Sequence, residues 1–354
     1  MTRVAVVRVR GLTLFGKYTN AIEKLRKLCE VDEVYVESSV NQDQLAEMLQ
    51  GYEVVISEPM APVFGEEFFE ANSSVKLIVI NGRGYDNVDV ESAVKHGVLV
   101  ARVPGYCEAQ SVAEHTLALL LYLLRNVKRA ENFVRNGLWS REGYVLGDFM
   151  APSLDDLVYG FIGFGWIGSR VASILSRGFN ARSILVYDPY VPRRVVEEHG
   201  WVWVERLEDL LSRADVLLIH AELNDQTYHL LGERELGLVK EGVVIVNTAR
   251  GAIIDTNALV KYLEKGKIRG VALDVVEGEP IPGDHPLLRF ENVVVTPHIA
   301  YATRKAVECM DLTIVKAVEC YLGKHCEIEE LVVKKKPWYC YSENWSQFSE
   351  SATC

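Results

Sequence analysis

Short apolar runs alternate with amphipathic segments along the first hundred residues. The runs occupy residues 4–9, 34–36, 54–57, 77–80 and 98–101, and valine, isoleucine and leucine dominate them, as is typical of buried strands. Between them, residues 18–29, 42–49 and 64–70 place apolar side chains at helical spacing, for example at Ile22, Leu25 and Leu28. This alternation predicts a parallel sheet covered by helices.

A second strand–helix series begins at residue 157. Its predicted strands are residues 158–162, 183–187, 202–204, 216–219, 243–246, 270–273 and 293–295. The regular alternation predicts a Rossmann-like domain. Two longer helices are predicted at residues 108–129 and 304–322. The first is apolar on more than one face, so we expect it to be buried or to pack against another subunit.

A glycine-rich turn follows the first strand of this second series. Gly163, Gly165 and Gly168 form a Gly-x-Gly-x-x-Gly sequence that precedes a helical segment. In such turns the first glycine permits a sharp turn, the second lets the backbone approach a pyrophosphate, and the third lets the helix pack on the sheet. Because it lies between a strand and a helix, the turn predicts a dinucleotide-binding site.

Asp188 ends the next strand. A carboxylate at that place accepts hydrogen bonds from the adenosine ribose hydroxyls and repels a 2′-phosphate. Arg193 and Arg194 follow closely, and we interpret them as solvent-exposed loop charges rather than as partners of a 2′-phosphate. NAD(H) is therefore the expected cofactor, with NADP(H) less favoured.

Three residues that suit acid–base chemistry follow later strands. Arg250 comes at a strand end, where its guanidinium offers two parallel donors to a carboxylate or a carbonyl oxygen. Glu279 and His298 supply a carboxylate and an imidazole, and the imidazole exchanges protons near neutral pH while the carboxylate orients it. Asp274 ends another strand and is a candidate for the nicotinamide end of a cofactor. Together these residues predict hydride and proton transfer on a small acid.

Composition narrows the function further. The net charge is −11 and the pI about 5.3, which argues against nucleic-acid binding. No apolar stretch approaches the roughly 20 residues that cross a bilayer, and the N-terminal residues are predicted to form a buried strand rather than a signal peptide. We therefore expect a cytoplasmic protein without a membrane partner.

The cysteines and histidines give no sign of a metal site. The seven scattered cysteines lack a Cys-x-x-Cys pair, which predicts free thiols, with a disulfide among Cys326, Cys340 and Cys354 as the alternative. No zinc-binding spacing occurs among the eight histidines. His115 is expected to pack in its helix or at an interface.

Several segments, in their order and spacing, are typical of one family. They are GYDNVD at residues 84–89, SVAEHT at 111–116, GFGWIG at 163–168 with Asp188, NTARG at 247–251, LDV at 273–275, EGEP at 277–280 and TPHIA at 296–300. With these motifs the chain resembles the D-isomer-specific 2-hydroxyacid dehydrogenases over about residues 4–325.

The resemblance implies an α/β fold of two doubly wound parallel-sheet domains. A Rossmann-like cofactor domain would be inserted into a flavodoxin-like substrate domain. Residues 1–103 and 299–330 would form the substrate-binding domain and residues 104–298 the NAD-binding domain. Residues 331–354 would be a C-terminal extension to which no role is assigned.

The resemblance also implies roles for single residues. His298 would be the catalytic acid/base, Glu279 its carboxylate partner and Arg250 a substrate-binding residue. Arg83 and Gly84 would bind the substrate carboxylate, together with Arg250 and His298. Besides the glycines and Asp188, the implied cofactor contacts are Trp166, Ile167, Thr248, Ala249, Asp274 and Ala300.

The expected activity is NAD(H)-dependent reduction of a small 2-keto acid to the D-2-hydroxy acid by a homodimer. The substrate would be of the glyoxylate, hydroxypyruvate or pyruvate class. Two alternatives stay open: a D-3-phosphoglycerate dehydrogenase, and a non-catalytic NAD(H) sensor similar to the C-terminal-binding-protein corepressors. The sequence departs from the family pattern at Arg83, at Trp166, and at Ala221 and Glu222, which replace a usual residue–proline pair.

Overall fold

The chain divides into two compact units. The structure is a computed structural model, and it describes residues 1–10, 20–140, 146–323 and 333. Among these, unit 1 contains residues 1–108 and the segment that starts at Ala302, and unit 2 contains residues 109–301. Cys326, Cys340, Cys354 and, apart from Val333, the predicted extension 331–354 lie outside the described residues.

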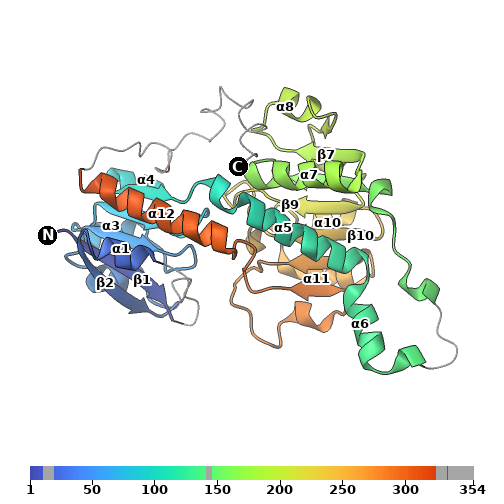
Figure 1. The fold of residues 1–354 in the computed structure, drawn as a ribbon, viewed down its shortest axis with the longest axis horizontal. Helices are drawn as coiled ribbons and strands as arrows, with labels where there is room; N and C mark the ends of the chain where they lie inside the picture. The colour runs from blue at the N-terminus through green and yellow to red at the C-terminus, as the bar shows by residue number, and fades with distance from the viewer. Residues whose placement is uncertain (11–19, 141–145, 324–332, 334–354) are drawn as a thin grey trace. The chain divides into compact units, whose positions relative to one another are not determined.

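Unit 1 is a five-stranded parallel sheet with helices on both faces (Figure 1). Its strands are β1 Arg3–Val9, β2 Glu30–Val36, β3 Val54–Ser57, β4 Leu77–Ile80 and β5 Leu99–Arg102. Its helices are α1 Ala21–Leu25, α2 Gln42–Met48, α3 Glu66–Ala71, α4 Val90–Lys95 and α12 Arg304–Tyr321. The order β2-β1-β3-β4-β5 is that of a flavodoxin-like doubly wound sheet. The five predicted strands are confirmed, although β2 is longer than expected.

Both faces of this sheet are buried, which explains its continuous apolar strands. Val4 of β1 belongs to the same buried cluster as Ile314 of α12. The next residue, Ala5, points to the opposite face and clusters with Leu45 of α2. A strand covered on both faces needs apolar side chains at every position, so it shows no alternation with polar residues.

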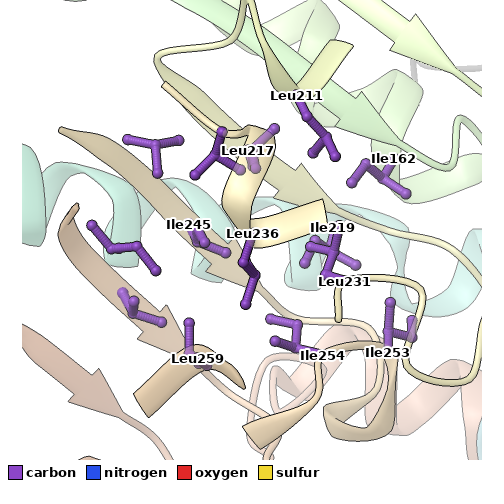
Figure 2. Close-up of a cluster of buried hydrophobic side chains, with 14 of the residues drawn as sticks. Ile162, Leu211, Leu217, Ile219, Leu231, Leu236, Ile245, Ile253, Ile254 and Leu259 are labelled. Carbon is purple, nitrogen blue, oxygen red and sulfur yellow. The ribbon is translucent and has the colours of Figure 1, made fainter. Parts of the chain in front are cut away.

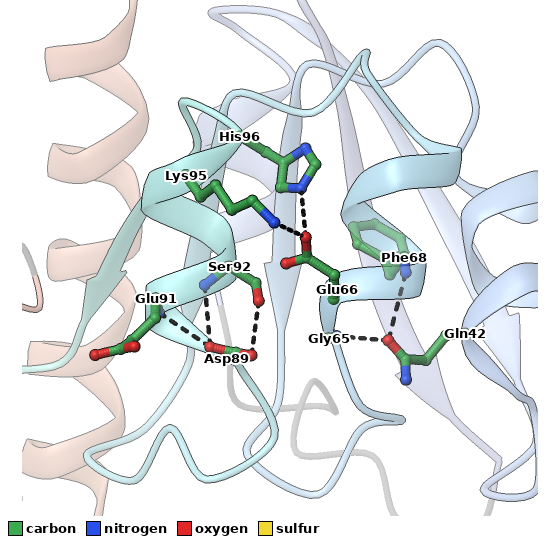
Figure 3. Close-up of polar contacts among 9 residues, drawn as sticks. All are labelled: Gln42, Gly65, Glu66, Phe68, Asp89, Glu91, Ser92, Lys95 and His96. Atoms are coloured by element: carbon green, nitrogen blue, oxygen red, sulfur yellow. Dashed lines mark hydrogen bonds and ion pairs between the residues drawn. The ribbon is translucent and has the colours of Figure 1, made fainter.

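Side-chain contacts fix helices α3 and α4 of unit 1 (Figure 3). Asp89, the last residue of the GYDNVD motif, caps α4 by accepting hydrogen bonds from the backbone N–H of Ser92 at 3.0 Å and from its hydroxyl at 2.7 Å. Glu66 of α3 pairs with Lys95 of α4 and, at 3.3 Å, with His96. The hydrogen bond from Lys95 is the main cause that lowers the pKa of Glu66 to about 2. The motif therefore starts α4, and the ion pair ties α4 to α3.

A disulfide in unit 1 shows that the expectation of free thiols was wrong. Cys107, at the start of α5, is bonded to Cys309 of α12, with 5.5 Å between their Cα atoms. Cys320 is also disulfide-bonded, whereas Cys29 is a buried free thiol. The partners Cys107 and Cys309 are 202 residues apart, so only the fold brings them together. Because disulfides are rare in a reducing cytosol, the cytoplasmic location stays a prediction.

Unit 2 is a seven-stranded parallel sheet, also covered on both faces (Figure 1). Its strands are β6 Val158–Ile162, β7 Ser183–Tyr187, β8 Val202–Trp203, β9 Val216–Ile219, β10 Val243–Asn247, β11 Ile268–Leu273 and β12 Val293–Val295. Its helices are α6 Val127–Arg135, α7 Trp166–Phe179, α8 Arg193–Glu197, α9 Leu207–Leu211, α10 Glu233–Leu238 and α11 Thr256–Glu264, and α5 Gly105–Leu124 runs into it from unit 1. All seven predicted strands are confirmed.

The sheet order of unit 2 is β12-β11-β10-β9-β6-β7-β8, which is a Rossmann order with a reversal between β6 and β9. On one face, α9, α10 and α11 close an apolar core (Figure 2). Ile219 of β9, Ile245 of β10 and Leu236 of α10 are fully buried in it. This core holds the carboxyl ends of the central strands in fixed positions, and those ends carry the candidate site.

The long helix predicted at residues 108–129 is interrupted. Asn126 has a left-handed backbone (φ 54°), and it separates α5 from α6. Helix α5 buries apolar side chains such as Leu120, whereas α6 has no buried residue and exposes Val127 and Val134 by 42% and 50%. The surplus apolar surface therefore lies on α6. In the described part of the chain, no helix is long and apolar enough to cross a membrane.

Candidate active site

The glycine-rich turn lies where the strand order of unit 2 reverses. Gly163 has φ +89°, and a Cβ there would lie 2.5 Å from the backbone nitrogen of Ala221, which follows β9. A Cβ on Gly168 would lie 2.5 Å from the carbonyl oxygen of Gly163. No atom lies within 4 Å of a Cβ built on Gly165, just before α7. The turn thus fits a pyrophosphate, because its accessible backbone adjoins the unpaired N–H groups that begin a helix.

Asp188 follows β7 beside this turn. Its carboxylate accepts hydrogen bonds from the backbone N–H groups of Phe164 at 2.8 Å, Tyr190 at 2.9 Å and Val191 at 3.1 Å. Burial raises the pKa of Asp188, these bonds lower it, and the charge of Glu222 adds to the net rise. The carboxylate is therefore fixed in place, with a second acidic residue near it that the sequence analysis did not assign to the site.

His220 follows β9 beside the glycine turn, and it is half-buried with both ring nitrogens out of contact with solvent. Its ring stacks on Phe161 with 6.1 Å between the ring centroids. Burial lowers the pKa of His220 to about 3, so its imidazole is neutral at physiological pH. Among the described residues neither ring nitrogen has a hydrogen-bond partner.

The candidate catalytic residues follow three neighbouring strands. β10, β11 and β12 are adjacent and parallel, and their last residues stand in register. Arg250 follows β10, Glu279 follows β11 and His298 follows β12. The carboxyl ends of parallel strands meet at one edge of the sheet, which is where ligands bind in open α/β folds.

His298 and Glu279 form a hydrogen-bonded pair. Nδ1 of His298 lies 2.5 Å from Oε1 of Glu279, and the two side chains are 21% and 23% exposed. The other Glu279 oxygen accepts the backbone N–H of Val276 at 3.1 Å. His298 has a left-handed backbone (φ 53°), held by its N–H donating to the carbonyl of Asp274 at 2.8 Å. With Nδ1 turned to the carboxylate, Nε2 is left for proton exchange.

The turn that presents Arg250 is shaped by Asn247. The fully buried Asn247 side chain accepts from the backbone N–H of Ala249 and donates to the carbonyl of Arg250, both at 2.9 Å. The Arg250 guanidinium donates to the carbonyl of Ala249 at 2.8 Å. The NTARG motif therefore encodes a rigid turn as well as a cation.

The turn with Arg250 packs closely against the loop with Glu279. A Cβ on Gly251 would lie 2.0 Å from the carbonyl carbon of Val276 and 2.2 Å from the backbone nitrogen of Glu277. Only glycine permits this approach. The two loops therefore support each other's position.

Asp274 organises the segment after β12. Its carboxylate, 1% exposed, accepts from the backbone N–H groups of Ile299 at 2.9 Å and Ala300 at 2.8 Å and from the hydroxyl of Thr296 at 2.6 Å. Nε2 of His115 lies 3.4 Å from it. Burial raises the pKa of Asp274, but these hydrogen bonds hold it below its usual value. The bond with His115 has the largest lowering effect. As predicted, His115 is a packed residue.

Arg83 and Gly84 belong to unit 1, where they follow β4. The Arg83 carbonyl accepts a hydrogen bond from Nη1 of Arg102 at 3.3 Å, and the Arg102 guanidinium lies 4.7 Å from the ring centroid of Tyr85. A second guanidinium therefore adjoins the loop that is expected to bind a carboxylate. No sequence motif marks Arg102, which ends β5.

The structure groups most predicted site residues in unit 2. Trp166 and Ile167 open α7, Thr248 and Ala249 follow β10, and Ala300 binds Asp274. The contacts that the sequence analysis missed join distant segments: the Thr116 and Thr248 hydroxyls, 2.8 Å apart, are separated by 132 residues. No local pattern marks such pairs. Among the described residues, no group of three metal-ligating side chains occurs.

Unit 2 combines a Rossmann-like sheet and a glycine-rich turn with an arginine and a histidine–carboxylate pair at its ligand-binding edge. This is the architecture of a nicotinamide-dependent oxidoreductase. The chain belongs to the D-isomer specific 2-hydroxyacid dehydrogenase family, because residues 117–300 match the NAD-binding domain of that family. The predicted family is thereby confirmed.

Individual relatives agree with this assignment. The chain is 44% identical to the glyoxylate reductase of Aeropyrum pernix over 233 residues, which cover 65% of this chain and 68% of that one. It is 34% identical to the D-3-phosphoglycerate dehydrogenase of Methanocaldococcus jannaschii over 297 residues, which cover 84% of this chain but only 55% of that protein. Among solved structures, it is similar to a D-lactate dehydrogenase from Aquifex aeolicus complexed with NAD and lactic acid, with a TM-score of 0.80, 31% identity, and coverage of 94% of this chain and 100% of the other.

Proposed function

We propose that this protein is an NAD(H)-dependent enzyme that reduces a small 2-keto acid to the D-2-hydroxy acid. The observation that carries the proposal is the His298–Glu279 pair, with 2.5 Å between its atoms, at the same sheet edge as Arg250. Glyoxylate, hydroxypyruvate and pyruvate are the proposed substrates. The test is the oxidation of NADH in the presence of each keto acid, followed by absorbance.

In this reaction the bound nicotinamide supplies the hydride that the keto carbon accepts. His298 donates the proton on Nε2 to the forming alkoxide, and in the reverse direction it removes the hydroxyl proton. Glu279, bound to Nδ1, orients the ring. Arg250 holds the substrate carboxylate and polarises the keto group.

NADH is expected to bind more tightly than NADPH. Asp188, and Glu222 near it, place negative charge where a 2′-phosphate would add more, while Arg193 is paired with Glu197 at 2.7 Å. Replacing Asp188→Asn removes the charge, at the cost of one accepting oxygen, and should narrow the preference for NADH over NADPH by about fivefold or more. The two dissociation constants are measured by fluorescence titration.

A matched control is Glu233→Gln, which removes a carboxylate from an exposed ion pair with Lys261 in the same unit. It should leave the preference unchanged. Tighter binding of NADPH than of NADH to the unmodified protein would contradict the cofactor proposal.

Arg83 is proposed to select small, polar or anionic substrates. Hydrogen bonds to charged groups are worth roughly 1.5–3 kcal/mol, so Arg83→Ala should lower kcat/KM by about tenfold or more on glyoxylate and hydroxypyruvate. The loss on a bulky apolar keto acid should be smaller. Equal losses on all substrates would show that Arg83 only supports its loop, and no loss at all would show that it does not reach the substrate.

A phosphorylated substrate is the second candidate. The alignment with a D-3-phosphoglycerate dehydrogenase and the two guanidinium groups at the loop after β4 favour it, because a phosphate is an additional anion to bind. Comparing 3-phosphohydroxypyruvate with hydroxypyruvate separates the two candidates. A kcat/KM at least about tenfold higher for the phosphorylated acid, which is the effect of one such bond, would favour the second.

We further propose a homodimer. Helix α6 exposes an apolar face with Val127 and Val134, and Trp139 beyond it is 63% exposed. Surfaces of this kind are typical of protein–protein contacts. Light scattering should give about twice the chain mass of 39.8 kDa, and a mass near that of one chain at micromolar concentration would contradict the proposal.

A further inference from the structure

A second histidine–carboxylate pair lies in the loop that carries Glu279. Nε2 of His229 is 2.6 Å from Oε1 of Glu277, and the two side chains are 32% and 29% exposed. The proposed reaction uses neither residue. The pair nevertheless joins the EGEP loop after β11 to a segment that precedes α10.

The segment with His229 is anchored in the core of unit 2. His229 donates its backbone N–H to the carbonyl of Ala252 at 2.8 Å. Leu231 donates in the same way to Ile253 at 3.0 Å, and Figure 2 shows these two side chains, together with Ile254, inside the apolar core. This segment therefore runs beside the chain that continues from the Arg250 turn, and it offers a fixed support.

The conformation of His229 is unusual for a residue with a side chain. Its φ is +49°, in the left-handed region, as is the φ of His298 at +53°. Its ring stacks on Tyr228, with 4.1 Å between the centroids and an interplanar angle of 15°. A backbone of this kind costs free energy and persists only where surrounding contacts hold it. Here it turns the ring nitrogen toward Glu277.

Glu277 is held on its other side as well. Its backbone nitrogen lies against Gly251, where a Cβ would come within 2.2 Å. Val276, which precedes it, is 5% exposed and donates its N–H to the Glu279 carboxylate at 3.1 Å. A displacement of the backbone at Val276 and Glu277 would therefore disturb the hydrogen bond that holds the Glu279 carboxylate.

The two carboxylates of the EGEP loop have similar partners. Glu277 and Glu279 are two carboxylates on one short loop, and each is paired with a histidine from a different segment.

We propose that His229 and Glu277 are positioning residues: their pair fixes the EGEP loop so that Glu279 meets Nδ1 of His298. The catalytic part of this proposal rests on the proposed function, whereas the geometric part does not. His229 thus acts on the reaction through Glu279, without touching the substrate.

The test uses the full chain with two single variants, the double variant that combines them, and one control variant. Glu277→Gln is nearly isosteric and removes only the charge, and His229→Asn accepts the left-handed backbone but cannot reach Glu277. The double variant completes a mutant cycle. Glu233→Gln, in an exposed ion pair with Lys261, is the matched control for charge removal.

Two readouts are expected to change. The first is kcat for glyoxylate reduction with NADH, which should fall about tenfold in each single variant, since small misplacements of a catalytic group cost this much or more. KM for glyoxylate should change less than about twofold, because the variants do not change Arg250, the proposed substrate-binding residue. The double variant should be no slower than either single variant.

The second readout does not depend on turnover. In ¹⁵N-histidine-labelled protein, the proton on Nδ1 of His298 that binds Glu279 should give a strongly downfield NMR signal, assigned by its loss in His298→Asn. We expect this signal to weaken or shift in Glu277→Gln and His229→Asn and to stay unchanged in Glu233→Gln.

Unchanged kcat and an unchanged His298 signal in both single variants would overturn the proposal, even if the variants unfold at lower temperature. Such a result would mean that the pair is only a structural contact. If the unmodified protein reduces no keto acid, the proposed function fails, and the NMR signal still decides whether His229 and Glu277 position Glu279.

Discussion

Replacing His298→Asn is expected to lower kcat for keto-acid reduction by about 10²–10⁴-fold, the usual contribution of general acid–base catalysis. Asparagine accepts the left-handed backbone of this position (φ 53°), and its amide can still donate to Glu279. It carries no proton that exchanges near neutral pH. The loss should therefore fall on the chemical step, while the dissociation constant for NADH stays within about twofold.

His199→Ala is the control for this variant. His199 lies in the same unit, is exposed, and bonds through Nδ1 to the carbonyl of Val195 at 2.9 Å. It should retain full activity. A kcat for His298→Asn within about threefold of the unmodified protein would show that another group, or water, supplies the proton.

Replacing Arg250→Ala is expected to lower kcat/KM by about 10²-fold or more, because two charge-assisted hydrogen bonds to the substrate are lost. KM should rise and kcat should fall together, since the guanidinium acts on the bound substrate and on the transition state. Arg250→Lys keeps the charge without the two parallel donors and should recover only part of the loss. Steady-state kinetics on glyoxylate measure all three proteins.

Arg234→Ala serves as the control, because Arg234 is an exposed arginine of the same unit that pairs with Glu208 at 2.7 Å. Its kinetics should match those of the unmodified protein. Full recovery by lysine would mean that Arg250 supplies only a positive charge. Retention of kcat/KM in Arg250→Ala would remove this residue from the site.

The strands could be predicted from sequence because the helices of each unit bury both faces of its sheet. Every position of a strand such as Leu77–Ile80 is then apolar, and the run stands out without alternation. The glycine turn was equally visible, since the short distances at Gly163 and Gly168 exclude any side chain. Burial of a strand and close backbone contact at a glycine each restrict the residue types of a short segment, so they can be recognised in the sequence.

Contacts between distant segments could not be predicted in the same way. The disulfide between Cys107 and Cys309 and the contact of His115 with Thr296 join residues 202 and 181 positions apart. The break at Asn126 was also missed, because apolar spacing continues through it. The pairing of Glu277 with His229 depends on a left-handed backbone that nothing in the neighbouring sequence indicates.

The order of the strands explains why the site residues meet. Arg250, Glu279 and His298 are spread over the last third of unit 2, and their motifs alone do not place them together. The adjacency of β10, β11 and β12 brings the three loops to one edge. The motifs therefore indicate which side chains can react, and the order of the strands determines that they lie close together.

The most direct test of the proposed function is turnover with NADH on glyoxylate, hydroxypyruvate, pyruvate and 3-phosphohydroxypyruvate, with chiral analysis of the products from the last three. The account predicts that NADH is oxidised in step with formation of the 2-hydroxy acid and that the chiral products are D-isomers. Binding of NADH without turnover on any of these acids, or formation of L-isomers, would contradict it.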